Sequence, residues 1–338
     1  MKKTGSIHLV ARAPLPRNMR MTGSNSRLIF TLLIGALLAI NNARVIAAEP
    51  ALKATILGSG YVEPLADKYG ASILVEAGTE KLLFDAGRGT TIRLNQIPVP
   101  YDAIDKVFLT HLHSDHVVGL PDLYLTGWVL GRRDTPLRLW GPEGTSQMAK
   151  HMVHAFDFDI TVRRDTHTRY AAIGATIDAM DFEGGVIYDA NGITVTAFTV
   201  DHGPVKPAFG FRVDYAGRSI GISGDTRPSN NLIAHTRDVD VLFHEAFAPE
   251  AYSAAHPDVP YLVIKAIESV HTTPSQAGKI FAAVNPKLAV FYHIDPGKTF
   301  ADELTRDARK YYNGPLEVGE DLMSFNIGEE IKVRRQLP

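Results

Sequence analysis

The sequence predicts an α/β protein in which two β-sheets pack face to face with helices outside. Short apolar runs bounded by Gly, Asn or Asp predict strands, and helical patterns lie between them. The strands fall into two successive halves, each with its own helices, and the apolar face of a sheet must be buried against another layer. No internal repeat, low-complexity tract or Pro/Ser linker interrupts the chain after Ala51, so we expect one large domain over residues 49–338.

Each element follows from its hydrophobic periodicity and from its flanking residues. The predicted strands span residues 53–57, 72–77, 81–84, 106–109, 137–140, 193–200, 209–213, 219–223, 239–243 and 288–292. The predicted helices span residues 89–94, 144–156, 229–234, 261–269 and 273–284. The last helix has the clearest start, because Thr273, Pro274 and Gln276 supply an N-cap, a first-turn proline and a capping-box glutamine.

The composition is that of a globular protein with a sizeable core, since 45% of the 338 residues are hydrophobic and 21% are charged. It excludes a disordered chain. The absence of cysteine excludes a disulfide-stapled scaffold, thiol nucleophiles, cysteine-ligated zinc and iron–sulfur clusters. A metal site in this chain must therefore be built from His and Asp ligands.

The first 48 residues have the three-part pattern of a secretory signal peptide. They hold seven basic residues and no acidic one, and a 13-residue apolar run (28–40) precedes the small residues Ala47 and Ala48. A membrane-spanning helix needs about 20 apolar residues, so we do not expect a permanent membrane span. The sequence thus predicts a signal peptide over residues 1–48 and a periplasmic or secreted protein.

Removing the leader changes the charge balance of the chain. The whole sequence has a formal net charge of -2, whereas the part after residue 48 holds 28 basic and 37 acidic residues, a balance of -9. Binding to nucleic acid draws on Lys and Arg contacts to phosphates. We therefore do not expect a nucleic acid partner, and we interpret the doublet Arg132-Arg133 as solvated loop charges.

Metal-ligating residue types gather directly after predicted strands. His111, His113, Asp115 and His116 occupy one six-residue stretch behind the strand at 106–109. Further candidates follow later strands, namely His202, Asp225 and His293. Imidazole and carboxylate groups are zinc ligands, and seven of them suit two ions that share one carboxylate. The same groups also accept iron and manganese, so the sequence does not decide the metal.

With His-x-His-x-Asp-His at 111–116 and the later His, Asp and His, the chain resembles the metallo-β-lactamase superfamily over residues 51–333. The resemblance implies an αβ/βα four-layer sandwich with two Zn²⁺ ions. It implies that His111, His113 and His202 hold one ion, that Asp115, His116 and His293 hold the other, and that Asp225 bridges them. In Leu83-Phe84-Asp85-Ala86-Gly87 it implies that Asp85 orients a ligand loop.

Three further motifs resemble the tRNase Z and arylsulfatase-like branch of that superfamily. They are Ser223-Gly224-Asp225-Thr226-Arg227-Pro228, His244-Glu245-Ala246 and His271-Thr272-Thr273. In that branch the histidine corresponding to His271 works near the leaving group, and the glutamate corresponding to Glu245 orients it. A carboxylate-supported imidazole is able to donate a proton to a departing oxygen.

From these features we predict an exported dinuclear zinc hydrolase that cleaves sulfate ester or phosphodiester bonds of small anionic or ester substrates. In this prediction a hydroxide that bridges the metals and is held by Asp115 attacks, and His271, supported by Glu245, protonates the leaving oxygen. The tRNase Z family carries a long tRNA-grasping arm between strands where this chain has only residues 214–218. A folded tRNA is therefore not the substrate that we predict.

Other interpretations stay open at this point. A lactonase or β-lactamase-like hydrolase would use the same site, although the bridging aspartate at 225 is unusual in β-lactamases without a cysteine ligand. A tRNase Z-type endonuclease and a non-catalytic metal-binding protein are the remaining alternatives. Homodimers are common in the branch, and no residue pattern in this chain decides the oligomeric state.

Overall fold

The computed structural model describes residues 52–166, 170–295 and 297–335, which belong to the unit Glu49–Pro338. The predicted signal peptide, residues 1–48, lies outside the described residues. Within the described part of the chain, every helix is too short or too polar to cross a membrane.

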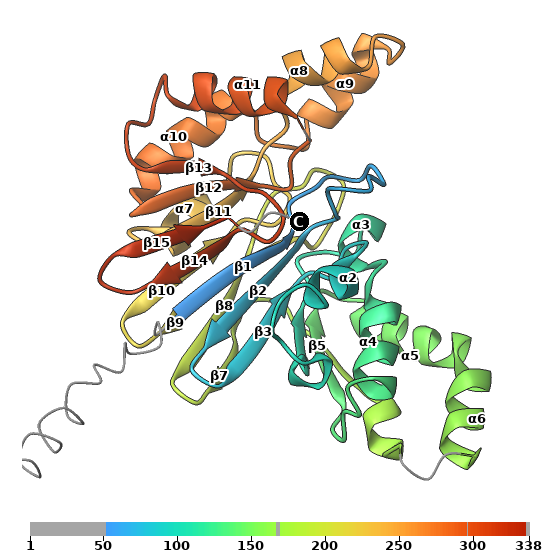
Figure 1. Cartoon of the computed structure of the whole chain (residues 1–338). Helices are drawn as coiled ribbons and strands as arrows, with labels where there is room; N and C mark the ends of the chain where they lie inside the picture. Colours follow the sequence, from blue (N-terminus) through green and yellow to red (C-terminus); the bar gives the residue numbers. More distant parts are fainter. Residues whose placement is uncertain (1–51, 167–169, 296, 336–338) are drawn as a thin grey trace, which may run out of the picture. The chain divides into compact units, whose positions relative to one another are not determined.

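Two β-sheets form the centre of the molecule (Figure 1). The first, in spatial order, holds β15 (Ile331–Arg334), β14 (Ser324–Ile327), β1 (Leu52–Gly58), β2 (Ser72–Ala77), β3 (Glu80–Phe84), β4 (Lys106–Phe108), β5 (Leu137–Gly141) and β6 (Ile177–Asp181). The second holds β13 (Leu316–Val318), β12 (Leu288–Tyr292), β11 (Val241–Glu245), β10 (Arg218–Ile222), β9 (Phe209–Tyr215), β8 (Ile193–Thr199) and β7 (Gly185–Ala190). Every strand predicted from the sequence is present, and β6, β7, β13, β14 and β15 are additional.

The main core lies between the two sheets and is rich in aromatic rings. Phe108 on β4 stacks on Phe84 and Trp140, with ring centroids 5.1 and 4.8 Å apart. Phe243 on the second sheet meets Phe325 on the first, at 5.2 Å. Aromatic side chains bury large apolar areas, so these contacts fix the two sheets face to face.

Helices cover the outer faces of both sheets. The first sheet packs against α2 (Thr90–Leu94), α4 (Leu120–Val129), α5 (Thr145–Ala155) and α6 (Asp157–Thr166). The second packs against α7 (Asn230–Thr236), α8 (Pro249–Ala255), α10 (Pro274–Val284) and α11 (Lys298–Ala308). The short α3 (Ser114–Val117) and the outlying α9 (Tyr261–Glu268) flank them (Figure 1). The predicted αβ/βα four-layer sandwich is confirmed.

Parallel pairing brings the carboxyl ends of several strands to the same edge of each sheet. In the first sheet β3, β4, β5 and β6 are parallel. In the second, β10, β11, β12 and β13 are parallel, and the register sets Glu245 opposite Tyr292. Loops at the carboxyl ends of parallel strands are the usual place for ligand binding in α/β proteins.

The link between β9 and β10 is a tight hairpin turned by Ala216 and Gly217, which both have positive φ. This pair of conformations is typical of two-residue β-hairpins. The structure therefore has no inserted arm between β9 and β10, as the sequence predicted.

Arg133 differs from its sequence interpretation, because it is buried rather than solvated. Its guanidinium donates hydrogen bonds to the carbonyl oxygens of Tyr124, Thr135 and Gly174. Three carbonyl acceptors take the place of water at Nε and Nη2, while Nη1 is buried without a hydrogen-bond partner.

Candidate metal centre

The six-residue stretch after β4 supplies four of the seven predicted ligands. His111 and His113 lie between the end of β4 and the start of α3, and Asp115 and His116 lie within α3. His111 and His116 are fully buried, and Asp115 is nearly so. The reversal of the chain at α3 turns the second pair of side chains back toward the first.

The second sheet supplies the other three predicted ligands, and each follows the end of a strand. His202 comes after β8, Asp225 after β10 and His293 after β12. All three are buried. The preceding Gly224 has φ 60°, and a Cβ there would lie 2.5 Å from the Phe209 carbonyl oxygen, so the turn that presents Asp225 requires glycine.

The seven side chains form two adjacent groups, in which the ligand atoms lie within 4.8 Å of one another. One group holds His111, His113, His202 and Asp225, and the other holds Asp115, His116 and His293. Asp225 faces both, because its Oδ2 lies 3.8 Å from the Nε2 atoms of His111 and His202, while its Oδ1 lies 3.4 Å from Nε2 of His116. This geometry is that of a carboxylate between two metal positions.

Unpartnered buried atoms indicate that these groups fit metal ions. Nε2 of His111 and Oδ1 of Asp225 are buried without a hydrogen-bond partner. Such atoms cost free energy unless something binds them. Nε2 of His116 and Nε2 of His293 are 3.2 Å apart, close to the spacing of about 3.4 Å for two nitrogens on one tetrahedral zinc ion.

Hydrogen bonds on the far side of each ring fix which nitrogen faces the centre. The Thr110 hydroxyl donates to Asp85, so the Nδ1–H of His111 donates to Thr110 Oγ1 at 3.0 Å. The Nδ1–H of His202 donates to the Val270 carbonyl at 3.0 Å. Both rings therefore offer Nε2 as the ligand atom, as in the metal-bound histidines of many enzymes.

The protonation states of three of the seven side chains also suit metal binding. Burial and the neighbouring His116 lower the pKa of His111 well below its usual value, and burial lowers the pKa of His113. Burial raises the pKa of Asp225, but His293 and His116 outweigh it and hold that pKa well below the usual range. Neutral imidazole and ionised carboxylate are the forms that bind metals.

Asp85 connects the first sheet to the centre in the way the sequence predicts. Its Oδ2 accepts a hydrogen bond from Nδ1 of His116 at 2.8 Å, and its Oδ1 accepts from the Thr110 amide at 2.8 Å. The residue has φ 57°, a left-handed conformation that is strained for a non-glycine residue. Strain of this kind persists where surrounding contacts fix the backbone, and it clusters at functional sites.

Glu245 and His271 form a second carboxylate–imidazole pair, outside both ligand groups. Oε1 of Glu245 accepts hydrogen bonds from Nδ1 of His271 at 3.1 Å and from the amides of Thr226 and Thr272. Burial lowers the pKa of His271, but Glu245 outweighs it and raises this pKa to about 9. The ring of His271 lies 5.0 Å from that of His202, so a protonated imidazole stands beside the metal centre.

His244, the other titratable member of the His-Glu-Ala motif, lies elsewhere. Its Nδ1 donates to the Glu245 carbonyl at 2.7 Å, and its ring meets the edge of Phe281 in the outer helix layer. Its role is therefore in packing.

Tyr61 is a residue at the centre that the sequence did not single out. Its ring meets His293 and His271 edge-on, with centroids 5.5 and 6.1 Å apart. The loop that carries it is anchored, because Ser59 donates two hydrogen bonds to Asp321. The only signal for Tyr61 in the sequence was its position directly after Gly58-Ser59-Gly60.

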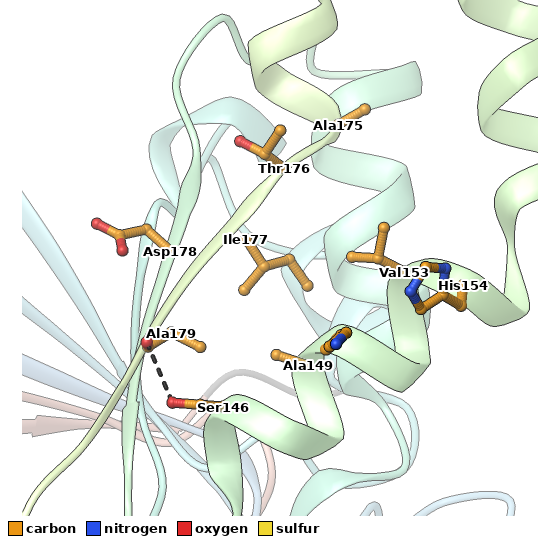
Figure 2. Close-up of a pocket in the computed structure, with 10 residues that line it drawn as sticks. Ser146, Ala149, Val153, His154, Ala175, Thr176, Ile177, Asp178 and Ala179 are labelled. Carbon is orange, nitrogen blue, oxygen red and sulfur yellow. Dashed lines mark hydrogen bonds between the residues drawn. The ribbon is translucent and has the colours of Figure 1, made fainter.

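A hollow of about 400 Å³ between α5 and β6 lies away from the centre (Figure 2). Ser146 donates to the Ala179 carbonyl across it, and His154 stands at its side. None of its lining residues belongs to either ligand group. The volume of a hollow alone therefore does not identify a functional site in this protein.

Two sheets between helix layers, with His and Asp side chains gathered in two groups at the strand ends, define the metallo-β-lactamase fold. A model of the beta-lactamase superfamily domain matches residues 80–294, and the chain belongs to this superfamily.

Curated relatives cover most of the chain. A ribonuclease Z of Mycobacterium sp. strain KMS is 33% identical over 288 residues, which are 84% of this chain and 99% of the relative. A ribonuclease Z of Mycobacterium bovis strain BCG Pasteur is 31% identical over 280 residues, with 82% and 98% covered. The protein is a metal-dependent hydrolase that acts on ester bonds.

Solved structures share the fold at lower identity. The metallo-beta-lactamase fold protein YhfI of Bacillus subtilis has a TM-score of 0.63 and 19% identity, covering 81% of this chain and 98% of that one. The short form of human tRNase Z has a TM-score of 0.57 and 23% identity, covering 80% and 98%.

Two predictions made from the sequence are wrong. The whole-length relatives are ribonucleases, which contradicts an arylsulfatase-like hydrolase of small substrates and contradicts the exclusion of a nucleic acid partner. The formal net charge of -9 after residue 48 led to the wrong prediction, because a net charge averages over the whole surface of the protein. Charge beside the centre depends on the local side chains, among them Arg227, which lines a hollow together with His271.

Proposed function

We propose that this protein is a zinc-dependent ribonuclease of the ribonuclease Z type, which hydrolyses a phosphodiester bond of RNA. One observation carries this proposal, namely the 33% identity to a ribonuclease Z over 99% of that relative's length. The arrangement of the centre supports it, because a two-metal site with an adjacent proton donor is suited to phosphodiester hydrolysis.

In this proposal His111, His113 and His202 hold one zinc ion, Asp115, His116 and His293 hold the other, and Asp225 bridges them. When bound, the ions would lower the pKa of a water molecule and neutralise charge on the phosphodiester. Six of the seven ligands are buried and His113 is exposed, so electrostatic interactions among the buried six are less screened than at the surface. Asp115, the most exposed of the buried ligands, is placed to orient the attacking water.

His271 is the residue that we assign to the leaving group. Hydrolysis breaks a P–O bond, and the departing oxygen needs a proton. His271 holds one at Nδ1 for Glu245, and its Nε2–H is directed away from that carboxylate. Donation from Nε2 leaves a neutral ring that is still hydrogen-bonded to Glu245 and is reprotonated by solvent before the next turnover.

Cleavage of RNA by the full chain tests the proposal. The protein, loaded with zinc and with its metal content measured, is incubated with a precursor tRNA that carries a 3′ extension, with unstructured RNA and with DNA. We expect endonucleolytic cleavage of RNA that an Asp225→Ala variant lacks. Intact RNA in the presence of protein that holds two zinc ions would refute the ribonuclease.

We also propose that the protein is exported, on the basis of the leader over residues 1–48. Expression of the full chain in a bacterium, with cell fractions separated and the N-terminus of the product sequenced, tests this. We expect a product that begins near Ala47 or Ala48 outside the cytoplasm. A full-length product in the cytoplasm would contradict export and would leave the ribonuclease proposal unchanged.

A further inference from the structure

A hollow of about 350 Å³ opens beside His271. Its lining residues come from the loop after Asp225, from α9, from the link between α9 and α10, and from the start of α10, and they are Arg227, Pro228, Lys265, Glu268, Ser269, His271 and Gln276. Pockets that hold small ligands measure roughly 300–1,000 Å³, so this hollow suits a group the size of one nucleotide. Because His271 lines it, an occupant lies directly against this ring.

Two cations of the hollow are paired with acidic side chains that are at least partly exposed, and Lys265 also lies over the Tyr261 ring, 5.8 Å from its centroid. Nε of Arg227 lies 2.8 Å from Asp201, and the two side chains are 47% and 46% exposed. Nζ of Lys265 lies 2.6 Å from Glu268, with exposures of 46% and 25%. Exposed ion pairs contribute little to stability, so both cations are able to exchange their partner for a phosphate.

The remaining polar groups of the hollow also suit an anion. The Gln276 carbonyl oxygen accepts from the Thr273 amide at 2.9 Å, which leaves the NH₂ group as a donor. Gln276 lies in the first turn of α10, whose positive dipole end favours negative charge. The guanidinium of Arg227 carries five N–H donors in a fork that matches phosphate oxygens.

We propose that this hollow binds a phosphodiester group of the leaving RNA strand, next to the bond that is cut. The inference rests on the proposed ribonuclease function, because the hollow is assigned to the RNA strand that leaves after cleavage. The position of His271 supports the inference. A proton donor must contact the departing oxygen, and the next nucleotide of the same strand then reaches the hollow that His271 lines. Arg227 and Lys265 would bind the phosphate, and neither has been assigned to the reaction.

Kinetics of three variants test the subsite. Arg227→Ala and Lys265→Ala are each expected to raise KM for RNA about tenfold with little change in kcat, and to lower the slope of log affinity against log salt by about 0.7. Glu268→Gln is expected to lower KM, because it removes the competing carboxylate from the hollow. Lys279→Ala is the matched control, since Lys279 lies over the Tyr311 ring elsewhere.

A modified substrate locates the contact. An RNA in which the first phosphodiester on the leaving side is a neutral methylphosphonate is expected to raise KM about tenfold for the wild-type protein. The same modified RNA should raise KM little further for Arg227→Ala, because the variant and the modification remove the same interaction. If the fold-changes in KM from the variant and from the modified RNA multiply, Arg227 does not contact that phosphate and the proposed subsite is refuted.

Binding of the same labelled RNAs, followed by fluorescence anisotropy, separates the two proposals. If Arg227→Ala, Lys265→Ala and the methylphosphonate all leave the kinetics of cleavage unchanged, the subsite is overturned and the ribonuclease function stands. Absence of cleavage, together with binding that both variants weaken, would overturn the ribonuclease and keep a phosphate subsite. Absence of cleavage with equal binding by all variants would overturn both.

Discussion

Asp85 and Glu245 build the same unit in the two halves of the molecule, with different outcomes. Each is a buried carboxylate at the end of a strand, Asp85 directly after β3 and Glu245 as the last residue of β11. Each accepts a hydrogen bond from Nδ1 of one histidine, His116 at 2.8 Å and His271 at 3.1 Å. Each also accepts from a backbone amide of a loop at the centre, that of Thr110 or Thr226. The unit alone therefore does not determine what the histidine does.

The difference lies in what the other ring nitrogen faces. Nε2 of His116 lies 3.5 Å from Asp115 and 3.4 Å from Asp225, within the ligand groups. His271 instead lines a hollow with two cations and belongs to neither ligand group. A carboxylate makes an imidazole more basic, and that basicity serves a metal in one half and a proton transfer in the other.

His116→Ala should have the largest effect. It removes a proposed ligand and leaves Asp85 buried without its partner, so we expect loss of metal from the second group and a fall in turnover of about 10³-fold or more. Metal analysis of the purified variant, together with cleavage rates, checks this. Retention of two ions at wild-type affinity would show that His116 is not a ligand.

His271→Ala should come next, with a fall in kcat of about 10² to 10⁴-fold. In contrast to His116→Ala, two metal ions should stay bound, because His271 lies outside both ligand groups. A substrate whose leaving group is an acidic phenol needs less protonation and should lose less activity. Loss of metal in this variant would remove the distinction between the two histidines.

Asp85→Asn should weaken metal binding about 10 to 100-fold while the ligands remain. The amide keeps the size of the side chain, but it no longer favours the Nδ1–H form of His116. Titration with zinc, monitored by activity and by thermal unfolding, measures the change. Excess zinc is expected to restore most of the turnover, and a defect that excess zinc leaves untouched would contradict a role through His116.

Glu245→Gln should have the smallest effect on metal content and a distinct effect on pH dependence. Glu245 raises the pKa of His271 to about 9, so the ring stays protonated below that pH and the activity that depends on it is lost above it. In the variant this alkaline loss of kcat should move to lower pH, with a fall of roughly tenfold at neutral pH. Glu76→Gln on β2, whose carboxylate pairs with Lys53 away from the centre, is the matched control. An unchanged alkaline limb in Glu245→Gln would remove Glu245 from proton transfer.

Much of the fold could be predicted because the central strands are continuous apolar runs. β11 and β12 are buried at every position, and such runs between Gly or Asp residues are recognisable in a sequence. The missed strands are different. β6 and β15 lie at sheet edges and alternate between half-buried and exposed residues, so they carry no apolar run. Their identity depends on the neighbours with which they pair.

The seven ligand positions were predictable, whereas the substrate was not. The ligands follow strand ends in a short motif, and all seven lie together in the structure. The prediction against a nucleic acid substrate used the net charge and the missing arm at residues 214–218, and neither shows where the remaining basic side chains lie. Arg227, Lys265 and His271 are separated in sequence, and only folding brings them to one hollow.

The sequence by itself predicted the two sheets from hydrophobic periodicity, which is a local property of a chain, and its resemblance to the metallo-β-lactamase superfamily implied the ligand set and the roles of Glu245 and His271. Only the tertiary structure showed that His271 lines a hollow together with Arg227 and Lys265. It also placed Tyr61 over the centre and buried Arg133 beneath three carbonyl groups. These facts depend on contacts between residues far apart in the chain, and burial and ring orientation are set by those contacts.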